Sequence, residues 1–412
     1  MGSQYIDSYE NVIHTIEKQG FENIQITLEN RYIKIAYENR IFRSEISAMG
    51  SILTTVLNSD IADSVSLTAL NRNIPLTKIG VDLDNFSAYF NGRTTDNTSF
   101  SSQLSVDMLY EDWDEFEKIP VLNPSSKKVE LTIKPGIETK FHTSSGFALW
   151  KLNLIPELSF SFAKGTQCII EGILPIFYEF DEDIKEIKLG DMYVNQTQRW
   201  TNSLWTSISG GIFHWKSNSW DSFDRFKGCK DGQKCYEFYR YGISAETDKF
   251  WENGQVNLKL KIDYTGHLDY HDGTWGYSDP NQFTWLSSLG YRFRHPNVYL
   301  SIGMGKNLYE KTPFGINIIR SFNEIDVGLH GRWYDLEYLS DFAGGITISV
   351  PIPFFQYWNN GLIVRSSKQF TWGLWYHDHP GSGYPKSGTS VENFYKKLFP
   401  TYIKNNTDQI TN

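Results

Sequence analysis

The sequence predicts a mainly β protein, in which an antiparallel transmembrane β-barrel of about 12 strands follows a small α+β domain. Three observations support this. Aromatic residues, which favour pleated strands over helices, make up 16% of the 412 residues. Most segments after residue 127 alternate apolar and polar residues with the period of two typical of strands. Several of these segments exceed the usual strand length of about five or six residues, and aromatic residues stand near their ends.

The first 91 residues are expected to form the α+β domain, with element order αββαββ. Residues 5–19 place apolar side chains on one helical face, and Gly20 follows where a helix C-cap would stand. Residues 46–57 return to a helical pattern. The expected strands are 24–28, 32–37, 65–70 and 77–83. Because it is compact and lacks a catalytic motif, this unit is expected to fold by itself, face the periplasm and dock a partner.

A change of composition marks the boundary between the two expected units. Residues 92–127 are rich in Asn, Thr, Ser, Asp and Glu and contain Pro120 and Pro124, which predicts a polar linker. The barrel is then expected over residues 128–376, and a C-terminal tail over residues 377–412.

Alternation alone does not distinguish a membrane barrel from a soluble sandwich or soluble barrel, because all three have one polar and one apolar strand face. The deciding features are strand length and aromatic ends. In residues 148–162 the alternation continues for longer than in a usual globular strand, with Trp150 and Phe162 near its ends. These features favour the membrane barrel.

The polar faces of two expected strands carry the candidate site residues. In a closed barrel they would line the lumen, and they are Lys259, Lys261, Asp263, Glu324, Asp326, His330 and Arg332. Paired charges there can hold a plug or contact a hydrophilic chain. The simpler alternative is that they fill a narrow lumen with ion pairs.

The chain has three cysteines: Cys168, Cys229 and Cys235. The last two flank the polar, turn-prone stretch Lys-Asp-Gly-Gln-Lys, so in an oxidising compartment they are expected to form a small loop disulfide. The alternative is two unpaired loop cysteines. Zinc is not expected, since His214 is the one histidine near the pair.

No motif indicates an enzyme, a metal site or a cofactor. A P-loop, a G-x-S-x-G elbow and an H-E-x-x-H sequence are absent. Two short groups imitate metal ligands, but adjacent side chains diverge on an extended chain, so loops are expected instead. They are His377-Asp378-His379 and the set His267, Asp269, His271 and Asp272. The acidic group Glu179, Asp181, Glu182 and Asp183 is interpreted as a solvated turn rather than glycosidase carboxylates.

The net charge of −9 argues against nucleic acid as a partner.

Four groups of residues resemble the YjbH family, which includes the GfcD-like proteins of capsule and exopolysaccharide operons. Two lie in the expected small domain: Gly20-Phe21-Glu22-Asn23-Ile24 and Tyr37-Glu38-Asn39-Arg40-Ile41-Phe42-Arg43. Two lie in the expected barrel: Gly303 to Tyr309 followed by Gly315, Arg320 and Phe322, and Asp341 to Ile346 followed by Val350-Pro351-Ile352. Where the family has an acidic residue shortly before Gly315, this chain has Thr312-Pro313.

The resemblance implies a bacterial outer-membrane accessory protein for export or assembly of an extracellular polysaccharide, either exopolysaccharide or capsule. It implies no catalytic residues. The implied partners are outer-membrane lipid, the polysaccharide chain and periplasmic export-machinery proteins. The first residues show no secretory signal. The alternative function is that of a soluble, aromatic-rich β protein that binds or cleaves carbohydrate.

Overall fold

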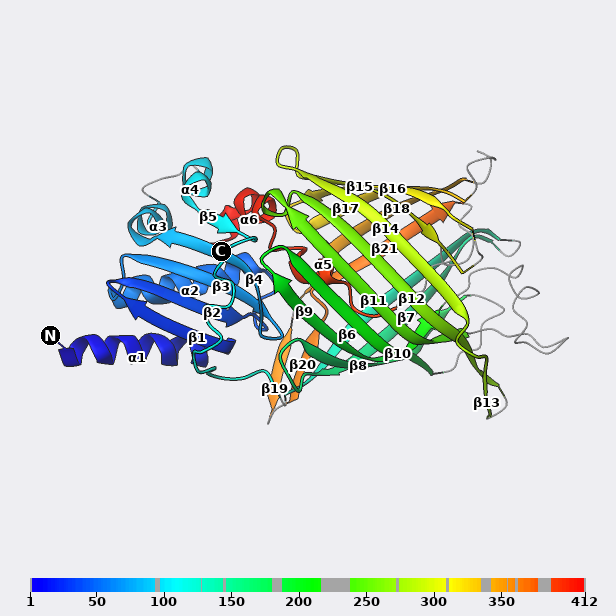
Figure 1. Cartoon of the computed structure of the whole chain (residues 1–412), viewed down its shortest axis with the longest axis horizontal. Coiled ribbons are helices and arrows are strands. Elements are labelled where there is room, and N and C mark those ends of the chain that lie inside the picture. The colour runs from blue at the N-terminus through cyan, green and yellow to red at the C-terminus, as the bar shows by residue number, and fades with distance from the viewer. Residues whose placement is uncertain are drawn as a thin grey trace.

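In the computed structural model a small α+β domain stands at one end of a large, strongly curved sheet (Figure 1). The structure describes residues 2–92, 97–126, 128–143, 146–179, 187–215, 238–271, 274–308, 311–334, 342–353, 355–359, 362–376 and 387–410.

The small domain has the predicted order αββαββ. Its elements are α1 (Gly2–Lys18), β1 (Glu22–Glu29), β2 (Tyr32–Glu38), α2 (Glu45–Ser59), β3 (Ser64–Asn71) and β4 (Ile74–Asp82). Strands β1 and β2 form a hairpin, β2 and β3 are parallel, and β3 and β4 form a second hairpin. The Ser44 side chain caps α2 by accepting a hydrogen bond from the Ile46 amide. Apolar side chains of the helices and the sheet form the buried core.

The segment expected as a polar linker has more structure than a linker. It follows α3 (Leu83–Phe90) and contains α4 (Asn97–Gln103) and β5 (Ser105–Asp107), and β5 pairs with β4 as the fifth strand of the sheet. Leu104, Val106 and Met108 are buried in the core of the small domain. Further along, Leu122 forms a β-bridge with Ile24 of β1. The expectation of a linker was wrong here because a few buried apolar residues are enough to fix a mostly polar segment.

The large sheet has 16 strands, most of them in an antiparallel meander. They are β6 (Val129–Thr143), β7 (Gly146–Phe160), β8 (Thr166–Tyr178), β9 (Lys188–Thr201), β10 (Leu204–Trp215), β11 (Phe238–Trp251), β12 (Val256–His271), β13 (Thr274–Tyr277), β14 (Gln282–Phe293), β15 (Val298–Lys306), β16 (Phe314–Phe322), β17 (Ile325–Trp333), β18 (Phe342–Pro351), β19 (Gln356–Asn359), β20 (Leu362–Ser366) and β21 (Gln369–Tyr376). The sequence predicted about 12. The difference comes largely from β13, β19 and β20, which have only four or five residues each and give almost no alternation signal.

The two ends of the meander, β6 and β21, approach each other. Trp372 of β21 donates a hydrogen bond from Nε1 to Oγ1 of Thr139 in β6, over 3.3 Å. Strand β20 pairs in parallel with the first residues of β6. Among the described residues, the ladder of backbone pairs runs from β19 to β21 without joining β21 to β6.

The burial pattern of the large sheet is inverted relative to that of a water-soluble protein. In β12, Leu258 and Leu260 are 41% and 45% exposed, whereas Asn257 and Thr265 are 0% exposed. The same holds on the neighbouring strands, where the exposed apolar residues include Val194, Ile208, Ile243, Leu289, Ile302, Ile318, Leu329 and Ile346. The buried polar residues include Asn195, Ser207, Ser244, Asp248, Thr284, Ser301, Asp326 and Ser349. No helix in the described part of the chain is long and apolar enough to cross a membrane.

The C-terminal segment, residues 387–410, returns between the small domain and the large sheet. It contains α5 (Val391–Tyr395), α6 (Pro400–Asn405) and the short 3₁₀ helix η4 (Thr407–Ile410), and Figure 1 shows α5 and α6 in red between the two bodies. Tyr395 packs on Trp205 and Phe250 of the large sheet, with ring centroids 5.0 and 5.6 Å away. Ile410 lies so close to Gly50 of α2 that a Cβ on that glycine would stand 2.0 Å from the Ile410 carbonyl oxygen. One core therefore contains residues from all three parts.

Candidate functional site

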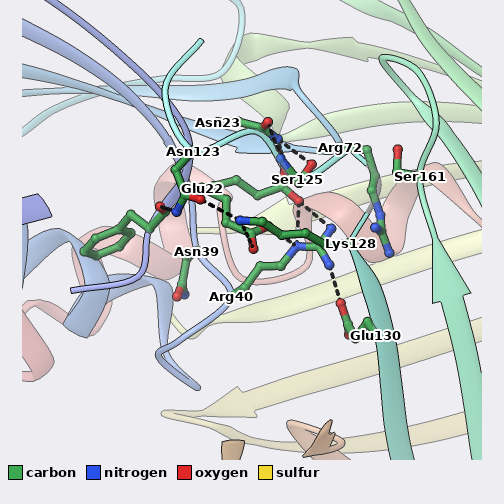
Figure 2. Close-up of polar contacts among 12 residues, drawn as sticks. Glu22, Asn23, Asn39, Arg40, Arg72, Asn123, Ser125, Lys128, Glu130 and Ser161 are labelled. Atoms are coloured by element: carbon green, nitrogen blue, oxygen red, sulfur yellow. Dashed lines mark hydrogen bonds and ion pairs between the residues drawn. The ribbon is translucent and has the colours of Figure 1, made fainter. Parts of the chain in front are cut away.

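The small domain meets the large sheet at a buried cluster of charges, called here the junction network: Glu22, Glu38, Arg40, Lys128, Glu130 and Arg365. Its centre is Arg40, which is 5% exposed. The Arg40 guanidinium lies 3.2 Å from Glu22 Oε2 and 3.0 Å from Glu38 Oε1, and it also pairs with Glu130 of β6 (Figure 2). One arginine of the small domain is thus held by carboxylates of both bodies.

Further cations surround these carboxylates. Lys128 Nζ is 3.1 Å from Glu22 Oε1, and Arg365 of β20 pairs with Glu130. Burial alone would raise the pKa of the Glu38 carboxyl, but Arg40 and Arg72 outweigh it and hold that pKa below its usual value. Glu38 is therefore a buried carboxylate ion that the surrounding cations stabilise.

Two asparagines shape the backbone around the junction network. Asn23 has a left-handed backbone, with φ of 47°, which asparagine tolerates better than most residues. Its amide group exchanges two hydrogen bonds with Ser125, of 2.8 and 3.0 Å, which ties the chain before β6 to β1. Asn39 Oδ1 accepts hydrogen bonds from the amides of Ile41 and Phe42 and so turns the chain after β2. The two short motifs that resemble YjbH in the small domain therefore meet at this network.

Two other arginines fix the small domain to the rim of the large sheet. At the tip of the β3–β4 hairpin, the Arg72 carbonyl accepts a hydrogen bond of 2.8 Å from the Gly165 amide, between β7 and β8. Arg199 of β9 is 3% exposed and donates to the carbonyls of Pro75 and Met108, over 3.1 and 3.0 Å. These contacts, with those of Arg40, hold the two bodies together at three points.

The predicted polar face of β12 contacts the C-terminal segment. Lys259 Nζ lies 2.8 Å from Glu392 Oε2, and Lys261 Nζ donates to the Ser387 carbonyl over 2.9 Å. Asp263 accepts hydrogen bonds from the hydroxyls of Ser387 and Thr284. Burial would raise the pKa of Glu392, but Lys259 and Arg292 outweigh it and lower the pKa to about 2.

The predicted polar face of β17 is also engaged. Asp326 lies 3.0 Å from Lys396 Nζ and 3.5 Å from Lys397 Nζ, both in the C-terminal segment. Glu324, just before the strand, pairs with Arg43 of the small domain. His330 has Asn317 and Thr347 within 2.9 Å of its ring nitrogens, and Arg332 is half-buried on the same strand. Five of the predicted charges thus contact the C-terminal segment or the small domain: Lys259, Lys261, Asp263, Glu324 and Asp326. Their role in a lumen stays a prediction.

A polar cavity of about 500 Å³ lies where the small domain, the large sheet and the C-terminal segment meet. Basic residues from all three parts line it, among them Arg40, Arg72, Arg365, Lys368 and Lys396. A second hollow, of about 720 Å³, lies on the small domain between α1 and α2. The first is the better candidate site because charged side chains of separate elements converge on it.

Several predicted features lie partly or wholly outside the described residues. These are Cys229, Cys235, the group His377-Asp378-His379, Asp272, and Asp181 to Asp183. Of the second histidine group, His267 is buried in β12. Among the residues that the structure describes, no three potential ligands gather as a metal site would require. Sequence reasoning missed Arg72 and Arg199, since a single arginine carries no motif. Arg40 was noted only as part of a family motif.

Comparison with known proteins identifies a family for the first part of the chain. Residues 4–188 match the family described as YjbH, exopolysaccharide biosynthesis protein YbjH. The YjbH resemblance is confirmed over that range. The matched range includes the small domain and the junction network apart from Arg365.

No curated protein matches. Among solved structures, a double mutant of the Rh. blastica porin is similar at a TM-score of 0.27 and 9% identity, over 60% of this chain and 95% of the porin. That similarity is too low to transfer any property.

Proposed function

We propose that this protein is an outer-membrane β-barrel that assists export or assembly of an extracellular polysaccharide and is not an enzyme. The observation that carries the membrane assignment is the inverted burial of the large sheet. Its apolar side chains face outward and its polar side chains face inward, strand after strand. This is the pattern of a barrel whose outer face meets lipid.

The outward apolar face of the large sheet would be unfavourable in water. Monomeric soluble proteins rarely expose contiguous apolar patches of more than a few hundred Å², and larger ones bind protein or membrane or cause aggregation. Strands β9 to β12 have 12 to 16 residues each. About nine to eleven residues of a tilted strand are enough to cross the hydrocarbon layer. Length and surface chemistry therefore agree.

The polysaccharide role is supported by the family that residues 4–188 match. The small domain stands at one end of the sheet, where it would face the periplasm and contact periplasmic export-machinery proteins (Figure 1). The buried charges pair with one another across elements, which suits a fixed assembly better than acid–base chemistry. We therefore expect the polysaccharide chain as a passenger or bound partner rather than a reactant.

Fractionation and gel mobility test the proposal. The full precursor should enter the outer-membrane fraction, and the purified protein should require detergent. Unboiled and boiled samples should migrate differently, as folded and unfolded barrels do. A sharp monomeric peak in buffer without detergent would contradict the membrane assignment and favour a soluble carbohydrate-binding or carbohydrate-cleaving β protein. Loss of surface polysaccharide on deletion of the gene, restored by the intact gene, is the expected physiological result.

A further inference from the structure

Among the residues that the structure describes, no carboxylate lies within 4.0 Å of the buried Arg72 guanidinium to form an ion pair with it. Arg72 is 7% exposed and lines the polar cavity. Its side chain makes one hydrogen bond, from Nη2 to Ser159 Oγ over 3.3 Å, while Nη1 is buried without a partner. Figure 2 draws Arg72 beside the junction network without a contact to it. An unpaired buried charge is costly, so its presence requires a reason.

Glu38 and Glu130 lie near enough to stabilise the Arg72 charge electrostatically, but both form their ion pairs with other cations. Each of the four other cations around Arg72 has a carboxylate of its own: Arg40 with Glu38, Lys128 with Glu22, Arg365 with Glu130, and Lys368 with Glu45. Arg72 is the cation left over. Burial, and after it the repulsion of Arg40, lowers the pKa of Arg72 to about 10. Burial also lowers the pKa of Lys368 on the same cavity. The cavity wall at this point has a surplus of positive charge.

The backbone at Arg72 is also unfavourable for an arginine. Arg72 and Asn73 form the two-residue turn between β3 and β4, with φ of 49° and 63°. Such turns prefer Asn, Asp or Gly, because left-handed backbone costs other residues energy. Turn geometry alone would therefore select asparagine at position 72. The arginine is explained better by what its guanidinium binds.

We propose that this cavity binds a carboxylate-bearing sugar unit, with Arg72 holding the carboxylate. A guanidinium presents two parallel N–H donors that match a carboxylate, and the buried Nη1 of Arg72 has no hydrogen-bond partner within the described part of the protein. The volume of about 500 Å³ lies in the range of small-ligand sites. The inference rests on the proposed function and deepens it: the polysaccharide is acidic, and a uronate residue of it is recognised where the small domain meets the large sheet.

The test is binding to the intact, folded protein in detergent, measured by titration calorimetry. The probes are trigalacturonate, maltotriose as a neutral trisaccharide, and inorganic phosphate. The variants are Arg72→Asn, which suits the turn, and Arg31→Asn as the matched control. Arg31 occupies the corresponding β1–β2 turn with φ of 60°, but it is exposed and pairs with Asp60 and Asp63. Melting temperature is measured for each variant without ligand.

Trigalacturonate should bind the wild type and the Arg31→Asn variant equally, and Arg72→Asn should weaken it about 10- to 100-fold, as expected for a lost charged hydrogen bond. Without ligand, Arg72→Asn should melt at or above the wild-type temperature. The inference is overturned by equal binding of maltotriose, by binding of phosphate but not trigalacturonate, by no binding, or by unchanged affinity in Arg72→Asn. It is also overturned if that variant unfolds, because Arg72 would then be structural. Heat-modifiability reports separately on the barrel, so the two proposals can fail independently.

Discussion

The small domain buries the apolar side chains of its strands, whereas the large sheet leaves many of its own exposed. In β2, Ile33 and Ile35 are completely buried in the shared core. In β12, Leu258 and Leu260 face outward while Asn257 and Asp263 are buried. Alternation therefore predicts a strand but not which face lies inside; the surroundings decide that. The C-terminal segment contacts both parts of the molecule. Its apolar side chains complete the core of the small domain, and its charged side chains pair with polar side chains inside the large sheet.

The largest effect is expected from removing the C-terminal segment. A chain ending at residue 386 lacks Val391, Tyr395, Ile403 and Ile410, all buried in the core shared with the small domain. Truncating a single buried aromatic or aliphatic residue costs about 2–5 kcal/mol, and whole domains are stable by only about 5–15 kcal/mol. The small domain should then lose its cooperative melting transition. Circular dichroism measures this transition.

The same reasoning revises the expectation that residues 1–91 fold alone. The isolated fragment should melt without cooperativity, and adding a peptide of residues 387–410 should restore order in part. A cooperative transition in the isolated fragment would show that the C-terminal segment is an accessory to this core rather than a part of it.

A smaller effect is expected at the junction network. Arg40→Met leaves Glu22, Glu38 and Glu130 buried without their shared cation, and breaking a buried pair in this way costs about 3–5 kcal/mol. The control Arg31→Met removes two exposed ion pairs, with Asp60 and Asp63, and should cost much less, because solvent screens exposed pairs. Denaturant unfolding of both variants measures the difference. Equal costs would show that the junction network does not stabilise the contact between the two bodies.

The smallest effect concerns pH. The pKa of Glu392 is lowered to about 2 in the folded protein, against about 4.3 in an unfolded chain. A carboxyl group whose pKa is lowered by folding stabilises the folded state at pH values above its pKa in the unfolded chain. This contribution therefore holds above about pH 4.3 and is lost as pH falls toward 2. Hydrogen exchange of residues 387–397 should therefore rise between those values. Glu392→Gln, which cannot titrate, should flatten that rise; an unchanged profile would show that Glu392 is not the group responsible.

Local sequence patterns predicted most of the helices and strands. They missed the contacts between segments that are far apart in the sequence. The order αββαββ followed from apolar spacing, and the inward polar faces of β12 and β17 followed from period two. The return of residues 387–410 was missed, although Val391, Tyr395, Leu398 and Tyr402 have the spacing of one helical face, which was a usable signal. No local signal exists for the pairing of Arg40 with Glu130, because those residues are 90 positions apart.

The most direct test of the central claim compares the two faces of β17. Leu329 is 52% exposed on the outward face, and Asp326 is 4% exposed on the inward face. Leu329→Arg should place a cation in lipid at a cost of about 2–4 kcal/mol, so the amount of heat-modifiable protein in the outer-membrane fraction should fall sharply. Asp326→Asn should insert nearly normally, although it loosens the contacts with Lys396 and Lys397. If Leu329→Arg inserts as well as Asp326→Asn, the outward face of this strand does not meet lipid, and the membrane assignment is wrong.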